Sequence, residues 1–234
     1  MRDIYELFQT EIVDKINCIV EVKNVTPLTN GSQNITLCNN KWLRVNQYLT
    51  DLNGFAWLVT NISNEEIITV KKPSGATDIV YLQKLTVKQP KFLFGSMTTA
   101  NNEYLLRGLD NRQKLPLIWL VENITEKEYG RESSIERDSN FRVYLLDDNN
   151  PNQMLADDFR NEVVYPMIAL KDEVVKAIQK NRIFKRYDSI DTRPFTRFGN
   201  ENEKGVFQNI LDDNLSGVEL KINLSIYKDK KCIC

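Results

Sequence analysis

Residues 115–121 read LPLIWLV, a nearly continuous apolar run in which Pro116 stands next to the first position. Such a run is typical of a β-strand that is buried on both faces, with the proline confined to the start of the strand. Residues 141–146, FRVYLL, predict a neighbouring strand. The charged segment 126–138 between them predicts an exposed loop or hairpin. The sequence therefore predicts a sheet whose central strands lie between residues 115 and 146.

Helical patterns flank these strands. An apolar residue recurs every three or four positions at Leu155, Phe159, Val163, Met167, Leu170, Val174 and Ile178. Pro166 lies inside this helix and is expected to kink it, because proline removes one backbone hydrogen bond. At the N-terminus, Asp3 and Glu6 form a capping box that opens a helix running to about Asn17. Near the other end, strict alternation over 218–227 predicts a strand with one buried and one wet face.

A different pattern occupies residues 18–88. Short segments of period two alternate with turn residues, at 18–25, 35–38, 42–45, 55–62, 66–72 and 79–87. Strands of this number and length predict a small all-β barrel, with Trp42 and Trp57 filling its interior. The predicted fold class is α+β, with residues 1–17 and 89–234 forming one domain and 18–88 forming an inserted barrel.

The barrel admits a second interpretation, because small barrels often bind single-stranded nucleic acid through exposed aromatic residues. Trp42, Tyr48, Phe55 and Trp57, however, lie beside apolar neighbours rather than within a basic patch. Their surroundings favour core packing over base stacking.

Histidine is absent from all 234 residues. Its absence excludes Ser-His-Asp triads, Cys-His pairs and histidine-based zinc sites. Carboxylate chemistry is still available, for example Asp147 with Asp157 or Glu162, but each is more simply a turn or helix-start residue. We expect no enzyme activity and no cofactor.

The possible metal ligands also have simpler interpretations. The cluster 147–152 suggests either a Ca²⁺ loop or a plain turn, and it lacks the EF-hand spacing. Cys18, Cys38, Cys232 and Cys234 form no CxxC pair, so small apolar side chains are a simpler interpretation than a zinc site. The role of Cys232 and Cys234 stays open. We expect no bound metal.

Charge is balanced overall, with 31 basic and 32 acidic residues and a net charge of −1. No uniform field is available to attract DNA or an anionic membrane. The N-terminus lacks a signal peptide and no run is long enough to span a membrane, so a cytoplasmic protein is expected. The segment 182–205 is locally basic and aromatic, and it is the candidate partner- or DNA-facing loop. Its candidate contact residues are Arg182, Lys185, Arg186, Arg193 and Arg197; a solvated loop with anchoring aromatics is the alternative.

Several runs in the second half resemble one protein family. They are LPLIWLVENITEKEYG (115–130), FRVYLLDDNN (141–150), VVYPMIALKDEVVKAI (163–178) and DNLSGVELKINLSIY (213–227). Their order resembles the tail terminator or tail-completion proteins of tailed bacteriophages, which open with a helix and build a sheet covered by helices. The resemblance covers about 150 residues, mostly 90–234, and the barrel and the 182–205 loop depart from it. The Asn- and Ile-rich composition is also similar to that of crAss-like phages.

This resemblance implies a structural virion protein in the neck or tail, present in the host cytoplasm before assembly. Such proteins form homo-oligomeric rings, hexamers or dodecamers, that connect portal-side and tail-side rings around the DNA channel. The implied partners are other copies of the chain, phage portal, neck and tail ring proteins, and DNA passing through the lumen without sequence-specific binding; no membrane is implied. The alternative function is a nucleic-acid-binding module that uses the 18–88 barrel and the basic 182–205 loop and binds DNA in a salt-dependent way.

Overall fold

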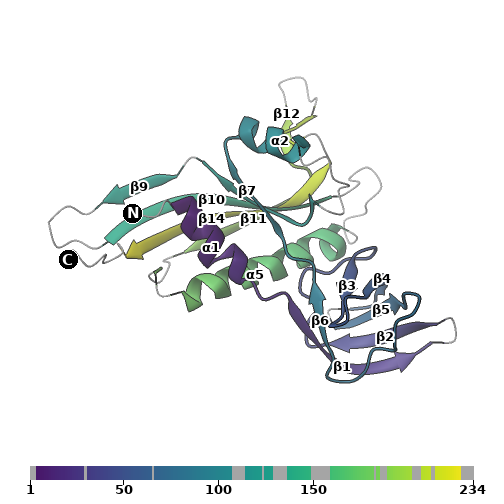
Figure 1. The fold of residues 1–234 in the computed structure, drawn as a ribbon. Helices are drawn as coiled ribbons and strands as arrows, with labels where there is room; N and C mark the ends of the chain where they lie inside the picture. Colours follow the sequence, from purple (N-terminus) through teal and green to yellow (C-terminus); the bar gives the residue numbers. More distant parts are fainter. Residues whose placement is uncertain are drawn as a thin grey trace.

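The computed structural model contains a closed barrel and a larger sheet covered by helices, which makes the chain an α+β protein (Figure 1). It describes residues 4–28, 31–64, 66–106, 114–122, 124–128, 136–148, 159–181, 183–184, 189–201, 207–211 and 214–227.

The barrel is built from six short antiparallel strands. They are β1 (Ile19–Pro27), β2 (Ser32–Leu37), β3 (Tyr48–Thr50), β4 (Ala56–Ile62), β5 (Ile67–Lys71) and β6 (Lys84–Val87). Their order is β1-β2-β5-β4-β3-β6, and β6 pairs with β1 to close the barrel. Trp42 and Trp57 are fully buried, as predicted. The predicted small barrel is therefore confirmed.

Three predictions within the barrel are wrong. Residues 42–45 form a loop, and the third strand begins at Tyr48. The backbone turns at Lys41 and Asn46, which have positive φ angles of 50° and 69°, so a strand cannot continue through them. Residues 79–83 also form a loop, and the last strand begins only at Lys84. Tyr48 is 44% exposed, because it points outward from β3 rather than into the core.

The larger sheet has the strand order β11-β14-β10-β8-β7, with β9 also pairing with β10. Its strands are β7 (Lys91–Gly95), β8 (Leu117–Val121), β9 (Thr125–Glu128), β10 (Glu136–Asp148), β11 (Ile190–Phe195) and β14 (Leu215–Tyr227). β7 and β8 are parallel, and the other pairs are antiparallel. The apolar run quoted above forms β8, and residues 141–146 lie beside it in β10, as predicted.

Helices cover both faces of this sheet (Figure 1). On one face lie α1 (Ile4–Glu11), which a 3-10 turn (Val13–Lys15) extends, and α5 (Tyr165–Lys180), which a π-helical turn (Arg160–Val164) precedes. On the other face lie α2 (Met97–Leu106) and the hairpin of β12 (Gly199–Glu201) and β13 (Phe207–Asn209). One apolar cluster joins the barrel interior to the α1 and α5 face, so the barrel is packed against the sheet domain.

Local geometry corrects several sequence predictions. The N-terminal α-helix ends at Glu11 rather than near Asn17, and only the 3-10 turn follows it. The irregularity expected at Pro166 appears as the π-helical turn just before it, where the missing proline N–H leaves the helical bonding incomplete. The predicted loop 182–205 contains an edge strand, β11. Asp3, Leu155 and the 149–152 part of the predicted turn lie outside the described residues.

The alternation predicted for residues 218–227 holds only in the middle of β14. Leu220, Ile222 and Leu224 are buried, while Lys221 and Asn223 are exposed. Before Leu220, every residue of the strand is buried, because α2 and the β12–β13 hairpin cover the second face there. The second face of the sheet is therefore covered at one end and open at the other.

Candidate functional site

The loop 38–47, between β2 and β3, joins the barrel to the sheet domain. Its anchor is Trp42, which is fully buried and whose indole Nε1 donates a hydrogen bond to the Lys88 carbonyl at 2.9 Å. The left-handed backbone at Lys41 and Asn46 folds the loop back on either side of this anchor. As a result, Lys41 and Arg44 both reach across the junction to the sheet domain.

Arg44 forms the most direct ionic link. Its Nη2 lies 2.7 Å from Asp147 Oδ1 and 2.6 Å from Asp148 Oδ1, and its Nη1 donates to the Asp148 carbonyl at 2.8 Å. The two aspartates are the last residues of β10. Charge-assisted hydrogen bonds of this length are the strong kind, so the guanidinium holds the barrel loop against the end of the central strand.

Burial makes this link costly. The Asp147 side chain is fully buried, and its Oδ2 has no hydrogen-bond partner among the described residues. Burial raises the pKa of Asp147 to about 7, although the attraction of Arg44 opposes the change; Asp148 adds to it. The direction follows from the unpaired oxygen, because removing a charge from water outweighs an attraction that reaches only one carboxylate oxygen.

A second buried pair ties the same loop to α5. Lys41 Nζ lies 3.6 Å from Glu173 Oε1, with the two side chains only 4% and 10% exposed. The Lys41 ammonium also donates to the Asn17 carbonyl, and Glu173 accepts a hydrogen bond from Lys176 at 2.8 Å. Burial lowers the pKa of Lys41, and Glu173 opposes that change. The loop is thus bonded to the segment after α1, to α5 and to β10.

Cys18 lies close to this second pair. Its Sγ is 3.8 Å from Gln89 Oε1, and burial raises the pKa of its thiol. A thiol in such a setting stays protonated and is a poor nucleophile. Cys38 is exposed, while Cys232 and Cys234 lie outside the described residues.

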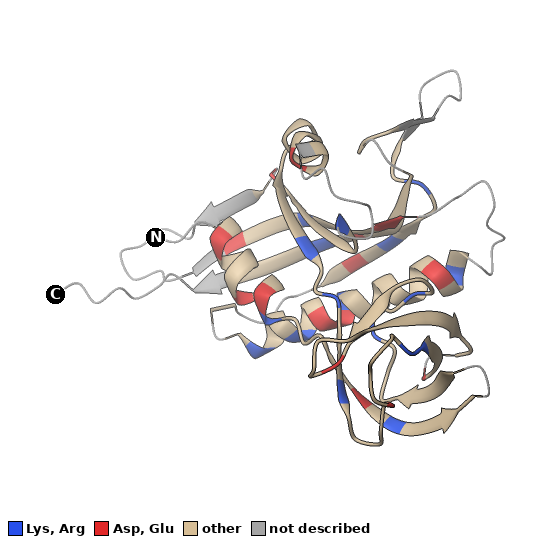
Figure 2. Cartoon of the chain, turned by 45° about the vertical axis from the view of Figure 1, so that its right-hand side comes forward, with Lys and Arg blue, Asp and Glu red and all other residues tan. Residues whose placement is uncertain are grey.

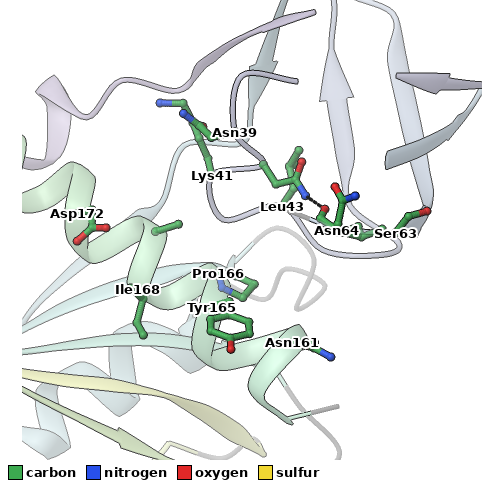
Figure 3. A pocket seen from close by; sticks show the side chains of 13 residues that line it. Asn39, Lys41, Leu43, Ser63, Asn64, Asn161, Tyr165, Pro166, Ile168 and Asp172 are labelled. Carbon is green, nitrogen blue, oxygen red and sulfur yellow. Dashed lines mark hydrogen bonds between the residues drawn. The ribbon is translucent and has the colours of Figure 1, made fainter. Parts of the chain in front are cut away.

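A cleft of about 450 Å³ opens beside the junction, between the barrel and the helix (Figure 3). Its barrel side is formed by Asn39, Asn40, Lys41 and Leu43 of the loop and by Ile62, Ser63 and Asn64 at the β4–β5 turn. Its helix side is formed by residues between Asn161 and Asp172. Its lining mixes amides and hydroxyls with aliphatic side chains. Such clefts at domain junctions are common places for ligands to bind.

The basic residues predicted as contacts are only partly described. Arg182, Lys185 and Arg186 lie outside the described residues. Arg193 is exposed on β11, where it lies opposite Glu219 of β14 in the sheet register. Arg197 follows the same strand and its Nε donates to Asn209 Oδ1 at 3.2 Å. Arg197 is therefore hydrogen-bonded to the β12–β13 hairpin, while Arg193 occupies an exposed position of the outer strand.

The second sheet face carries both signs of charge where its covered end meets its open end. Arg142 Nε lies 2.9 Å from Glu219 Oε1, and Tyr144 lies beside the same carboxylate. Burial raises the pKa of Tyr144, and Glu219 adds to that effect. Lys221 and Asp191 are both exposed and are paired in the register of β14 and β11. Basic and acidic residues are interspersed along these strands and along α5 (Figure 2).

The carboxylates considered for catalysis lie in unequal surroundings. Asp147 is shut off from solvent and bound to Arg44, so in this conformation no substrate reaches it. Glu162 is exposed in the π-helical turn, and Asp157 lies outside the described residues. Among the described residues, no three His, Cys, Asp or Glu side chains group together as a metal site would require. No described helix has the length and apolar character needed to cross a membrane.

The ionic junction was missed by the sequence analysis. Arg44 and Asp147 are 103 residues apart, and the sequence predicts a turn or helix start at Asp147, where the structure has the end of strand β10. One signal was present, since Arg44 is a lone charge within the apolar run Trp42-Leu43-Arg44-Val45. A charge in such a run points to a buried partner, although the sequence does not name that partner.

In comparisons with known proteins, no family model, no curated protein and no solved structure matches this chain.

Proposed function

We propose that this chain is a structural virion protein that forms a ring at the head-to-tail junction of a tailed bacteriophage, between portal-side and tail-side rings. The motifs in residues 115–227 suggest this role through their resemblance to tail-completion proteins. The observation that supports the proposal is that the two edges of one sheet are formed by unlike strands, β11 and β7.

A ring requires two different surfaces on each subunit that fit each other, because a head-to-tail contact must repeat until it closes. Within the described residues, β11 pairs only with β14, and β7 pairs only with β8. An unpaired strand edge presents N–H and C=O groups that another chain can bind. One edge of the sheet thus offers β11, a polar strand with four of its six residues exposed, whereas the opposite edge offers β7, a mostly apolar strand in which only Lys91 is exposed.

Side chains on and beside β11 carry charges of both signs. Thr192 and Arg193 are exposed, Lys221 lies on the neighbouring open face, and exposed Arg142 pairs with the buried Glu219 where the covered part of that face ends. Mixed charges of this kind set the register of an interface and suppress wrong partners without a large net field. They suit repeated contacts between identical subunits whose net charge is −1.

Particle mass and shape in solution test the proposal directly. Light scattering coupled to size-exclusion chromatography, followed by negative-stain imaging, is expected to show closed rings whose proportion grows with protein concentration. A protein that stays monomeric at every concentration and binds single-stranded DNA with a steep salt dependence would contradict it and favour the nucleic-acid-binding alternative.

Proline variants of β11 test which edge is used. Successive backbone N–H groups of a strand point to opposite sides, so of Asp191→Pro and Thr192→Pro one loses a bond to β14 and the other loses an outward N–H. We expect the outward variant to keep the monomer's melting temperature within a few degrees and to lose ring formation, measured by light scattering. Thr192→Ala is the matched control, since it keeps every backbone N–H. Rings that persist in a folded outward variant would rule out β11 as the contact strand.

A further inference from the structure

The side chains that line the cleft between the barrel and α5 are suited to binding a ligand, and the proposed ring contacts do not use this cleft. Its centre is Asn40, which is only 9% exposed and lies in the cleft lining. Its Nδ2 donates to the Asn64 carbonyl at 2.6 Å, which fixes the orientation of the amide, because the flipped form would bring two acceptors together. Its Oδ1 is then a buried acceptor without a hydrogen-bond donor among the described residues. A buried acceptor of this kind is unfavourable until a donor reaches it.

Charges around the cleft are already neutralised. Lys41 is bonded to the Asn17 carbonyl and paired with Glu173, and Asp172 lies 3.2 Å from Lys171. A phosphate or a cationic ligand would therefore bring an unpaired charge to the cleft. An uncharged ligand that donates a hydrogen bond fits without that cost.

The remaining lining favours a polypeptide main chain. Asn39, Ser63 and Asn161 offer amide and hydroxyl groups, which both donate and accept hydrogen bonds as a peptide backbone does (Figure 3). Ile62, Ile168 and Ala169 offer an aliphatic surface for side chains. Asn161 and Asp172 are 11 positions apart on the helix, so the helix side extends for roughly 16 Å, the length of about five extended residues.

We propose that this cleft binds an extended, uncharged polypeptide segment of a partner protein. Because Asn40 Oδ1 is not exposed in this conformation, binding includes a small local shift of the 38–47 loop that lets one main-chain N–H of the segment donate to that oxygen. Alternate side chains of the segment lie against Ile168 and Ala169, while rim amides bind its other backbone groups. Binding at the cleft requires only the folded monomer, so it is separable from ring formation.

Selection from a displayed library of random linear peptides tests this assignment. The monomeric full-length chain is the bait, and the best peptide is then measured by isothermal titration calorimetry. Two variants challenge the cleft: Ala169→Trp fills it, and Asn40→Ala removes the buried acceptor. Lys180→Trp, at the far end of α5, is the matched control for a tryptophan on the helix surface.

The expected result is enrichment of uncharged peptides whose Kd rises at least about tenfold in Ala169→Trp and in Asn40→Ala and is unchanged in Lys180→Trp. Circular dichroism confirms that each variant is folded. Failure to enrich any peptide over the Ala169→Trp bait overturns the proposal. So does a selected peptide that binds Ala169→Trp as tightly as the original chain, or a set of charged peptides whose binding disappears in high salt. These outcomes are independent of whether rings form.

Discussion

Replacing Gly217 by alanine is expected to lower the free energy of unfolding by at least about 3 kcal/mol, because an added methyl group collides with the backbone of the next strand. A Cβ at Gly217 would lie 1.9 Å from the Leu145 carbonyl oxygen and 3.2 Å from Leu146 Cα. These are main-chain atoms of β10 in the middle of the sheet, so no side-chain rotation relieves the collision. The two longest strands would have to separate, with loss of the pairing between them.

Thermal unfolding measures the effect. For a protein of this size, 1 kcal/mol corresponds to about 2–4 °C in melting temperature, so Gly217→Ala is expected to melt roughly 6–12 °C lower or to be recovered unfolded. Gly54→Ala is the control, because Gly54 has a φ of 84° and nothing within 4 Å of the added carbon. It is expected to cost about 1 kcal/mol from backbone conformation alone. Equal melting temperatures for the two variants would contradict the steric explanation.

The success of the strand predictions has a simple physical origin. A side chain in a strand alternates between faces, so burial leaves a pattern of period two or a continuous apolar run in the sequence. β8, β10 and β14 carry these patterns because they lie at the centre of the sheet. β11 lies at the edge, and four of its six residues are exposed, so hydrogen bonding to β14 forms it without an apolar pattern. For that reason the edge strand was mistaken for loop.

At residues 42–45 the opposite error occurs: the apolar composition predicts a strand where the structure has a loop. Trp42 and Leu43 are buried, as strand residues would be, but they belong to a loop that covers the end of the barrel. Burial determines which residues are apolar, whereas backbone angles determine whether they form a strand. The left-handed angle at Lys41 has no distinctive local sequence; asparagine is enriched at such angles, but Asn46 is one of many asparagines in this chain, so it does not stand out.

The candidate site depends on contacts that no local pattern records. Arg44 meets Asp147 only because the barrel packs on the end of β10, where the covering loop turns an apparent surface aspartate into a buried one. The cleft likewise forms between segments about 100 residues or more apart, at Asn40 and Ala169. Sequence reasoning identifies each element, but the junction between the two domains exists only in the folded chain.

Asp147 is expected to make the protein less stable as the pH rises from about 4 to about 7. Its pKa in the folded chain is raised from 3.8 to about 7, so the folded state holds a proton that the unfolded state has already released. The contribution of Asp147 to the free energy of unfolding is fully present below about pH 4 and decreases between about pH 4 and pH 7. Above about pH 7 it no longer changes. The raised pKa corresponds to roughly 4 kcal/mol between the two protonation states.

Comparison with Asp147→Asn isolates this effect from the other titrating groups. Asparagine is uncharged at every pH and retains an oxygen for Arg44, so the difference in unfolding free energy between the original chain and the variant reports Asp147 alone. We expect that difference to shift against the original chain by up to roughly 4 kcal/mol between pH 4 and pH 8, measured by urea unfolding. Asp148→Asn is the control, because that carboxylate is 42% exposed and its replacement is expected to change little.

The sign of the pH-dependent change in this free-energy difference shows whether burial or the attraction of Arg44 has the larger effect on Asp147. If the attraction of Arg44 outweighed burial, Asp147 would have a lowered pKa, and the original chain would gain stability over Asp147→Asn as the pH rises. The unpaired Oδ2 argues for the opposite sign, because half of the carboxylate charge has no donor to replace the lost water. Arg44→Met then provides the converse test at pH 8, where removing the only close cation on Asp147 Oδ1 among the described residues is expected to cost about 3–5 kcal/mol. A smaller loss in Arg44→Met than in Asp148→Asn would mean that the junction is held together by its apolar contacts and that the ion pair contributes little.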